Sequence, residues 1–185
     1  MRPAPDAARS LATRVREAAL LEGDFVLSSG KRSRFYVDKY LFSTQPDLLS
    51  DVATALAGRL PAGVERLAGV ALGAVPLVVA TSLSTGLPYV IVRKTVKEHG
   101  SSAGRGIEGN LRRGERVALI EDVVTTGAQA VEAAGDLLEA GAEVARILAV
   151  LDRREELSSR LGGFAFEALL RMEDLGVSGA NRARY

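Results

Sequence analysis

The chain has 185 residues, of which 47% are hydrophobic and 25% are charged. This length and composition are typical of one compact domain that buries its own core. The 24 basic and 23 acidic side chains leave a formal net charge of +1, which disfavours a nucleic acid or a membrane surface as the main partner.

The chain contains no cysteine, which excludes disulfides, thiolate metal sites and cysteine nucleophiles. No stretch approaches the roughly 20 apolar residues of a membrane span. The N-terminal segment also has no apolar signal-peptide core. We therefore expect a soluble, cytoplasmic protein.

The N-terminal part combines a helical pattern with two strand-like ones. Apolar side chains recur at helical spacing in residues 7–21, which predicts an amphipathic helix. Residues 24–28 and 34–40 have the composition of two short strands, joined by a hairpin-type connection that contains Gly30. We expect residues 1–45 to form this helix and a small hood.

The pattern of residues 46–177 alternates helices with apolar strands and predicts the core of a single domain spanning residues 1–185. A helix is expected to begin at Pro46. Apolar runs predict buried strands at residues 67–72, 89–93, 116–120 and 144–151. Helices over residues 75–86 and 127–140 supply the crossovers that parallel strands need. The predicted fold class is α/β, with an open, mostly parallel twisted sheet and helices on both faces. Residues 178–185 match no motif, and a disordered tail is one interpretation of them.

Two acids and a polar turn follow the apolar strand predicted at residues 116–120. In open α/β sheets, ligands bind outside the carboxyl ends of the strands. The carboxylates of Glu121 and Asp122 suit sugar hydroxyls or the water shell of Mg²⁺. The hydroxyls of the next two threonines and the N–H groups at the start of a helix suit a phosphate. A sugar phosphate fits both halves of this site. The alternative, a plain strand end followed by a helix cap, explains Thr125 and Gly127 but not the acid pair.

A long polar stretch lies between two of the apolar strands. Residues 95–115 are rich in glycine and have no sustained periodicity, which indicates a functional lid. His99 is the only histidine of the chain, and a histidine titrates near neutral pH. Arg93, Lys94 and Lys97 place three cations within five residues, which suits a strongly anionic ligand. The alternative is a solvated surface loop whose charges have no role.

Residues 118–129 read Ala-Leu-Ile-Glu-Asp-Val-Val-Thr-Thr-Gly-Ala-Gln and resemble the signature of type I phosphoribosyltransferases. These enzymes bind 5-phosphoribosyl-1-pyrophosphate, with the acids on the ribose hydroxyls and the following loop on the 5-phosphate. The residues to which the resemblance assigns the ribose and the 5-phosphate are Glu121, Asp122, Val123, Val124, Thr125, Thr126, Gly127, Ala128 and Gln129. No Walker-type loop is present, and no dinucleotide-binding fingerprint directly follows a predicted strand.

Residues 93–100 read Arg-Lys-Thr-Val-Lys-Glu-His-Gly and resemble the mobile catalytic loop of orotate phosphoribosyltransferases. The resemblance implies that the pyrophosphate is bound by Arg93, Lys94, Lys97 and His99. It implies that Lys97, His99 and Asp122 are the catalytic residues. It also implies Mg²⁺ as a cofactor, held through the substrate and water with no direct protein ligand.

Two further segments resemble the same family. Residues 25–40 resemble the hood over the orotate ring, and residues 150–156 resemble the strand end whose arginine pairs with orotate. The resemblance implies that orotate is contacted by Thr125, Arg153, Phe35 and Tyr36. A planar bidentate donor such as Arg153 suits a carboxylated pyrimidine, although a helix-start or surface ion pair remains the alternative.

The sequence also departs from the family. Some members carry a lysine where Ser28 stands, and others carry one where Gly73 stands, so these cationic contacts do not transfer. Gly73 and Ala74 predict a tight turn after a strand. Its N–H groups could approach the pyrophosphate, but a glycine required only for packing explains the turn equally well.

The resemblance implies an enzyme of de novo UMP biosynthesis that transfers the 5-phosphoribosyl group from 5-phosphoribosyl-1-pyrophosphate to orotate. It also implies a homodimer in which Lys97 and His99 of one subunit serve the site of the other. Two alternatives remain: a phosphoribosyltransferase for a purine or another base, and a non-catalytic nucleotide-sensing regulator of the same fold. A regulator is expected to add a DNA-reading domain or a basic face. Neither is evident, and we expect no nucleic-acid or membrane partner.

Overall fold

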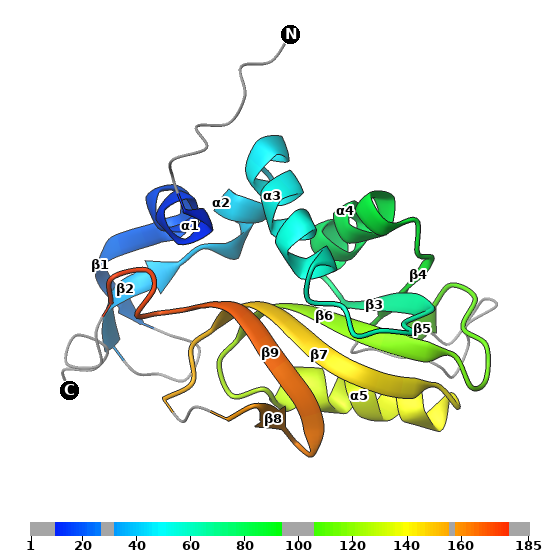
Figure 1. Ribbon diagram of the computed structural model, residues 1–185. Helices are drawn as coiled ribbons and strands as arrows, with labels where there is room; N and C mark the ends of the chain where they lie inside the picture. The colour runs from blue at the N-terminus through cyan, green and yellow to red at the C-terminus, as the bar shows by residue number, and fades with distance from the viewer. Residues whose placement is uncertain (1–9, 27–31, 94–105, 156–157, 178–185) are drawn as a thin grey trace, which may run out of the picture.

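The structure, a computed structural model, describes residues 10–26, 32–93, 106–155 and 158–177. Figure 1 shows a twisted central sheet with helices above and below it, and a two-stranded sheet to one side. The strands of the central sheet are β3 (Arg66–Val70), β4 (Tyr89–Val92), β5 (Ile107–Glu108), β6 (Arg116–Val124), β7 (Glu143–Asp152), β8 (Arg160–Leu161) and β9 (Phe164–Arg171). Their order is β5-β4-β3-β6-β7-β9-β8. Neighbouring strands from β4 to β9 are parallel, and β5 and β8 are antiparallel at the edges.

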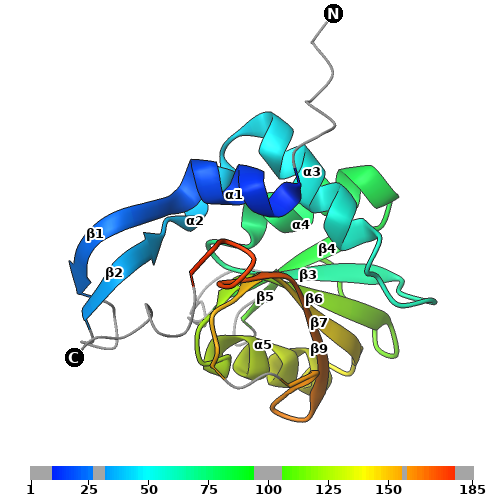
Figure 2. The ribbon, with the colours of Figure 1, turned by 60° about the vertical axis from the view of Figure 1, so that its left-hand side comes forward.

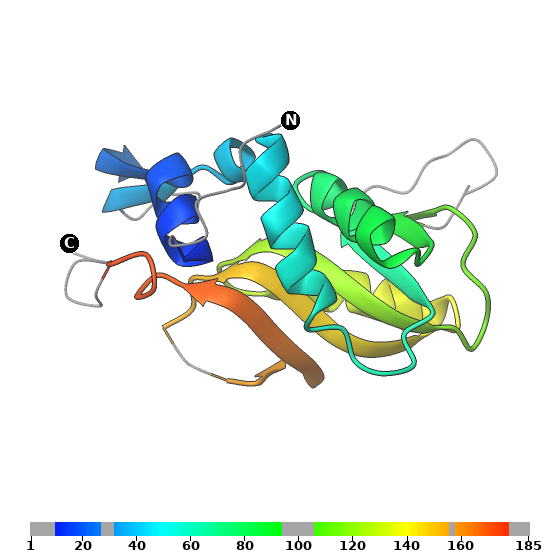
Figure 3. The ribbon, with the colours of Figure 1, turned by 45° about the horizontal axis from the view of Figure 1, so that its top comes forward.

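Helices cover both faces of this sheet, and they are α3 (Pro46–Ala57), α4 (Val75–Thr85) and α5 (Ala128–Glu139). Figure 3 shows α3 and α4 lying over one face, and Figure 1 shows α5 beneath the other. The alternation of side chains along β6 explains this arrangement. Ala118 and Ile120 pack in the apolar cluster that contains α3 and α4, whereas Val117 and Leu119 pack in the cluster that contains α5. The predicted α/β fold class is confirmed.

The N-terminal hood consists of α1 (Leu11–Ala19), β1 (Leu20–Val26), β2 (Arg32–Val37) and α2 (Lys39–Ser43). Strands β1 and β2 pair antiparallel, from Leu20↔Val37 to Val26↔Arg32. The predicted turn around Gly30 lies outside the described residues. Val15 and Phe42 of the hood are buried in the same cluster as α3, and Figure 2 shows the strands extending away from this anchor. The hood is therefore anchored in the core.

Several boundaries differ from those that periodicity predicts. The strand expected at residues 34–40 ends at Val37, because Asp38 caps α2 and accepts a hydrogen bond from the Tyr40 N–H at 3.0 Å. The helix expected at residues 7–21 ends at Ala19, where β1 begins. Lys39, which was expected in a strand, therefore lies in the first turn of α2.

The central sheet is also larger than predicted. The strand expected at residues 116–120 continues through the acids to Val124, because β7 pairs with it as far as Val124↔Asp152. Part of the expected irregular stretch forms β5, which pairs with β4. No sequence pattern predicted β8 or β9.

The tail at residues 178–185 lies outside the described residues. None of the described helices has both the length and the apolar character that a membrane crossing requires.

Candidate active site

The sheet has a topological switch point between β3 and β6. Strand β3 leads through α4 to β4 on one side, and β6 leads through α5 to β7 on the other. Ligands of open α/β sheets bind in the crevice at such a point. The ladder between β3 and β6 ends at Gly69↔Ile120, whereas β6 continues beside β7. Residues 121–124 therefore extend past β3, next to the turn that precedes α4.

A cavity of about 620 Å³ lies at this end of the sheet. The predicted sugar-phosphate residues from Glu121 to Gln129 line it, except for Ala128. Tyr36 from the hood and Arg153 from the end of β7 also line it. The structure thus brings together predicted site residues from three separate segments of the chain.

The two acids are buried: Glu121 is 6% exposed and Asp122 is 2% exposed. Oδ1 of Asp122 accepts a hydrogen bond from the Val123 N–H at 2.5 Å, and Oε1 of Glu121 accepts one from the Asp122 N–H at 3.2 Å. Within the described part of the chain, the other two oxygens, Glu121 Oε2 and Asp122 Oδ2, accept no hydrogen bond. Buried acceptors without donors are unfavourable. These oxygens therefore suit the hydroxyl groups of a sugar or the waters of a hydrated cation.

Lys39 approaches the acid pair from the hood. Its Nζ lies 2.7 Å from Asp122 Oδ2, in an ion pair that lacks the geometry of a hydrogen bond. Burial is the largest single effect and would lower the pKa of Lys39, but the contact with Asp122 and the nearby Tyr40 and Glu121 together outweigh it, and the pKa rises above its ordinary 10.5. Burial, and next the charge of Asp122, raise the pKa of Glu121 above its ordinary 4.5. In the cavity, the Lys39 ammonium is therefore paired with the Asp122 carboxylate. The neighbouring Glu121 has a raised pKa and favours its neutral form.

The turn after β6 leads directly into α5. Gly127 adopts a φ of +84°, which glycine tolerates better than other residues, and an added Cβ would lie 2.3 Å from Leu161 Cδ1. Thr125 and Thr126 are exposed, and Thr126 Oγ1 accepts a hydrogen bond from the Ala128 N–H at 3.3 Å. Gly127 has no side chain to cap α5, so the N–H groups of the first turn beyond Ala128 suit an anion.

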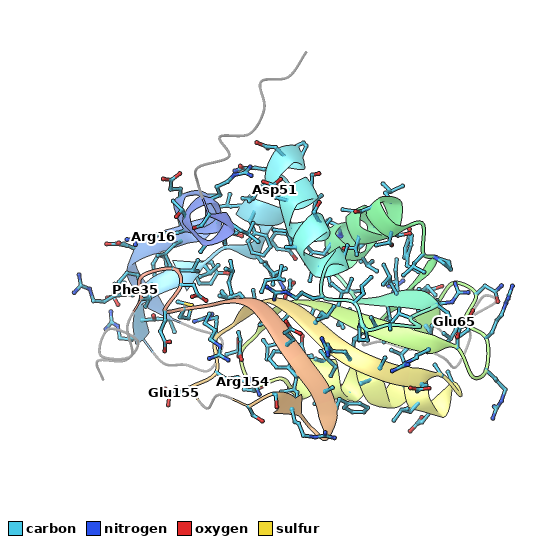
Figure 4. All side chains as sticks on the ribbon, in the orientation of Figure 1. Arg16, Phe35, Asp51, Glu65, Arg154 and Glu155 are labelled. Atoms are coloured by element: carbon cyan, nitrogen blue, oxygen red, sulfur yellow. The ribbon has the colours of Figure 1, made fainter. Side chains whose placement is uncertain are left out.

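Arg153 is held at the end of β7. Its N–H donates to the Val124 carbonyl at 2.8 Å, which joins the ends of β6 and β7. The neighbouring Arg154 donates to both carboxylate oxygens of Asp152, at 3.0 and 2.9 Å, and lies 4.5 Å over the ring of Phe166. Figure 4 shows Arg154 beside the end of β7. These contacts of Arg154 hold the turn after β7 in place, and Arg153 in this turn lines the cavity.

The hood places one of its two predicted orotate-binding aromatic residues in the cavity. Tyr36 is partly exposed, lines the cavity and lies 5.5 Å from the ring of Phe25. Successive residues of a strand point to opposite faces, and Phe35, labelled in Figure 4, packs on the core cluster instead. The structure therefore brings Tyr36, and not Phe35, next to the other predicted site residues.

The predicted pyrophosphate residues are only partly described. Arg93 follows β4, and its Nη1 lies 3.6 Å from Glu108 Oε1. Strand β3 separates β4 from β6, and Arg93 does not line the cavity formed by the described residues. Lys94, Lys97 and His99 lie outside the described residues, so their roles stay predictions. Within the described segments, no group of three or more His, Asp or Glu side chains could hold a metal ion.

Lys39 was not among the predicted site residues, because the strand pattern of residues 34–40 continues through it. Asp38, an N-cap residue type placed after an apolar strand, was the signal that a helix begins there. The structure also gives Gly73 a second role besides packing. A Cβ at this position would lie 1.4 Å from Asp122 Oδ2, so the turn before α4 approaches the carboxylate closely.

Comparisons with known proteins agree with this geometry. Residues 48–163 match the phosphoribosyl transferase domain family. The orotate phosphoribosyltransferase of Natronomonas pharaonis is 48% identical over 155 residues, which cover 83% of this chain and 87% of that protein. That of Archaeoglobus fulgidus is 47% identical over 158 residues, which cover 85% of this chain and 84% of that protein.

A solved structure extends the similarity to three dimensions. The crystal structure of orotate phosphoribosyltransferase from Aeropyrum pernix matches with a TM-score of 0.77 and 28% identity, and the match covers 90% of this chain and 96% of that one. The chain therefore belongs to the phosphoribosyltransferase family and, within it, to the orotate phosphoribosyltransferases.

Proposed function

We propose that this protein transfers the 5-phosphoribosyl group of 5-phosphoribosyl-1-pyrophosphate to orotate, which yields orotidine 5′-monophosphate and pyrophosphate in pyrimidine biosynthesis. One observation carries this proposal: the cavity joins the N-terminus of α5 and an arginine with two buried acids, each of which has an oxygen that accepts no hydrogen bond within the described residues. These groups match ribose hydroxyls, a phosphate and a carboxylated base, respectively. The names of the curated relatives support the same activity.

In the proposed complex, Glu121 and Asp122 accept hydrogen bonds from the ribose hydroxyls, and the turn at residues 125–129 donates to the 5-phosphate. Arg153 pairs with the orotate carboxylate. Orotate N1 forms the new bond to the anomeric carbon as the carbon–oxygen bond to pyrophosphate breaks, and pyrophosphate departs with the electron pair. The N1 proton is lost to solvent, and the configuration inverts. Since no protein nucleophile is needed, positioning and charge stabilisation provide the catalysis.

The cofactor proposal is Mg²⁺ held through the substrate and water. Glu121 Oε2 and Asp122 Oδ2, which accept no hydrogen bond in the described part of the chain, fit the waters of a hydrated cation, since carboxylates readily accept hydrogen bonds from such waters. When bound, this ion would neutralise negative charge on the pyrophosphate. Lys97 and His99 are proposed to stabilise the departing pyrophosphate, with Arg93 and Lys94 as further cations.

The assembly proposal is a homodimer in which Lys97 and His99 of one subunit serve the cavity of the other. The position of Arg93 supports this arrangement, because Arg93 follows β4 and does not line the cavity of its own subunit within the described structure. Two-fold symmetric dimers are also the commonest assembly of soluble chains. A cytoplasmic location stays a prediction.

The decisive test measures which base is consumed. The purified protein is incubated with 5-phosphoribosyl-1-pyrophosphate, Mg²⁺ and one of orotate, adenine, hypoxanthine or uracil, and base absorbance and released pyrophosphate are followed. We expect consumption of orotate with equal release of pyrophosphate. Faster use of another base would favour a different phosphoribosyltransferase, whereas binding without turnover would favour a nucleotide-sensing regulator.

A further inference from the structure

We propose that Lys39 is a positioning residue of the sugar-phosphate site, which holds the Asp122 carboxylate in place for the ribose hydroxyls, and that Gly73 leaves the space this ion pair needs. This role presupposes the proposed sugar-phosphate substrate. Lys39 belongs to the hood, so this role links the hood to the acid pair on β6. The sequence motif on β6 alone did not predict this link.

The contact between Lys39 and Asp122 links two separate parts of the fold. Lys39 lies in the first turn of α2, directly after the cap formed by Asp38, whereas Asp122 lies near the end of β6. The Lys39 side chain is 37% exposed and lines the cavity, and the Asp122 side chain is 3% exposed. The ammonium is thus the group through which the hood reaches the buried carboxylate.

The surroundings of Asp122 explain why it needs this partner. The neighbouring Glu121 is also buried, and two adjacent buried carboxyl groups destabilise each other's charged form. Oδ1 of Asp122 is held by the Val123 N–H, but Oδ2 has no hydrogen-bond donor in the described part of the chain. Lys39 is the cation at Oδ2. Without it, the carboxylate would turn away from this position, because a buried charge without a partner is strongly unfavourable.

Gly73 provides independent geometric support. A Cβ at residue 73 would lie 1.4 Å from Asp122 Oδ2 and 2.8 Å from Lys39 Nζ. The nearest atoms to that Cβ thus belong to the two members of the ion pair. Any side chain at residue 73 would displace the carboxylate or the ammonium, so glycine is required by the pair and not only by the turn.

The first test compares Lys39→Met with Lys39→Arg and with the control Arg59→Met. Arg59 has similar exposure, at 46%, and its ion pair with Glu167 lies outside the cavity. We expect Lys39→Met to raise the KM for 5-phosphoribosyl-1-pyrophosphate by about 10- to 100-fold, the size of a lost charged contact. The KM for orotate should change far less, Lys39→Arg should restore most of the loss, and the control should match wild type.

The second test is a double-mutant cycle between Lys39→Met and Asp122→Asn. If Lys39 acts through Asp122, the lysine substitution has little further effect once the carboxylate is gone. Multiplicative losses would overturn the proposal, because Lys39 would then act independently of Asp122. Equal KM increases for both substrates in Lys39→Met would also overturn it.

The third test uses Gly73→Ala, with Gly135→Ala as the control, because a Cβ at Gly135 meets no atom within 4 Å. We expect Gly73→Ala to weaken the binding of ribose 5-phosphate, measured by calorimetry, in the wild-type background but not in Asp122→Ala. Equal weakening in both backgrounds would contradict the role of the pair. This binding measurement does not depend on orotate turnover, so it separates failure of this inference from failure of the proposed function. Thermal unfolding of each variant verifies that the fold is retained.

Discussion

At the residue scale, the acid pair on β6 is the most distinctive feature of the cavity. Glu121 and Asp122 are buried, yet each has an oxygen without a hydrogen-bond donor in the described structure. Folding alone does not favour such an arrangement. A ligand that supplies two hydroxyl donors would satisfy both oxygens, so the pair is better explained by binding than by stability.

Asp122→Asn tests the charge of this pair. The amide keeps the shape but removes the negative charge that faces the ribose and the developing positive charge of the transition state. We expect kcat/KM for 5-phosphoribosyl-1-pyrophosphate to fall by about 10- to 100-fold or more, with an unchanged fold. The control is Asp136→Asn, because Asp136 lies on α5 and does not line the cavity. Unchanged kinetics in Asp122→Asn would count against the assignment.

Arg153→Ala tests the base side of the cavity. Since a planar guanidinium pairs with a carboxylate through two hydrogen bonds, we expect the KM for orotate to rise about 10-fold or more. The KM for 5-phosphoribosyl-1-pyrophosphate should change little. Steady-state kinetics with each substrate varied in turn provide the measurement, with Arg59→Ala as the control. Equal effects on both substrates would place Arg153 elsewhere in the mechanism.

At the element scale, the amino end of the sheet is stabilised by a pair outside the cavity. Arg66 at the start of β3 donates to Glu115 through Nε at 2.6 Å and Nη2 at 2.7 Å. The hydrogen bonds from Arg66 outweigh the effect of burial and lower the pKa of Glu115 from 4.5 to about 2. Because the folded-state pKa is the lower one, the stabilisation is present above about pH 4.5 and is lost as the pH falls toward 2.

We therefore predict that Arg66→Met lowers the free energy of unfolding at pH 7, and that its difference from wild type shrinks as the pH falls from about 4.5 toward 2. Denaturant unfolding at pH 7 and near pH 3 measures this change. The control Arg59→Met removes a more exposed pair and should cost at most about 1 kcal/mol. A difference from wild type that stays constant with pH would show that the pair does not titrate as described.

Several elements that the sequence predicted have a regular burial pattern. Strand β3 and most of β6 are continuous buried runs, and α5 has a clear apolar face. Strand β9 is mostly half-buried along its length, and Glu167 interrupts its apolar residues, so it lacks the uniform burial of β3. The predicted site on β6 follows from local sequence, but the contact of Lys39 with Asp122 joins residues far apart in the chain. Only the folded structure shows that contact.

At the scale of the whole molecule, the proposed dimer makes a prediction about mixed subunits. Lys97→Ala subunits, defective in the loop, are mixed with Asp122→Asn subunits, defective in the cavity, under exchange conditions. If the loop acts in trans, each hybrid dimer has one intact site. The mixture should then recover about a quarter of wild-type activity, because about half of the dimers are hybrids. If demonstrated exchange brings no recovery, the loop acts within its own subunit.

The central claim is that one crevice binds the sugar phosphate on its β6 side and the base on its β7 side. The most direct test is a crystal structure with orotidine 5′-monophosphate, which carries a phosphate, ribose hydroxyls and the base in one molecule. We predict the phosphate at the N-terminus of α5, the ribose hydroxyls on Glu121 and Asp122, and the base beside Arg153 and Tyr36. A nucleotide bound outside this cavity, or bound with its base at the N-terminus of α5, would contradict the claim.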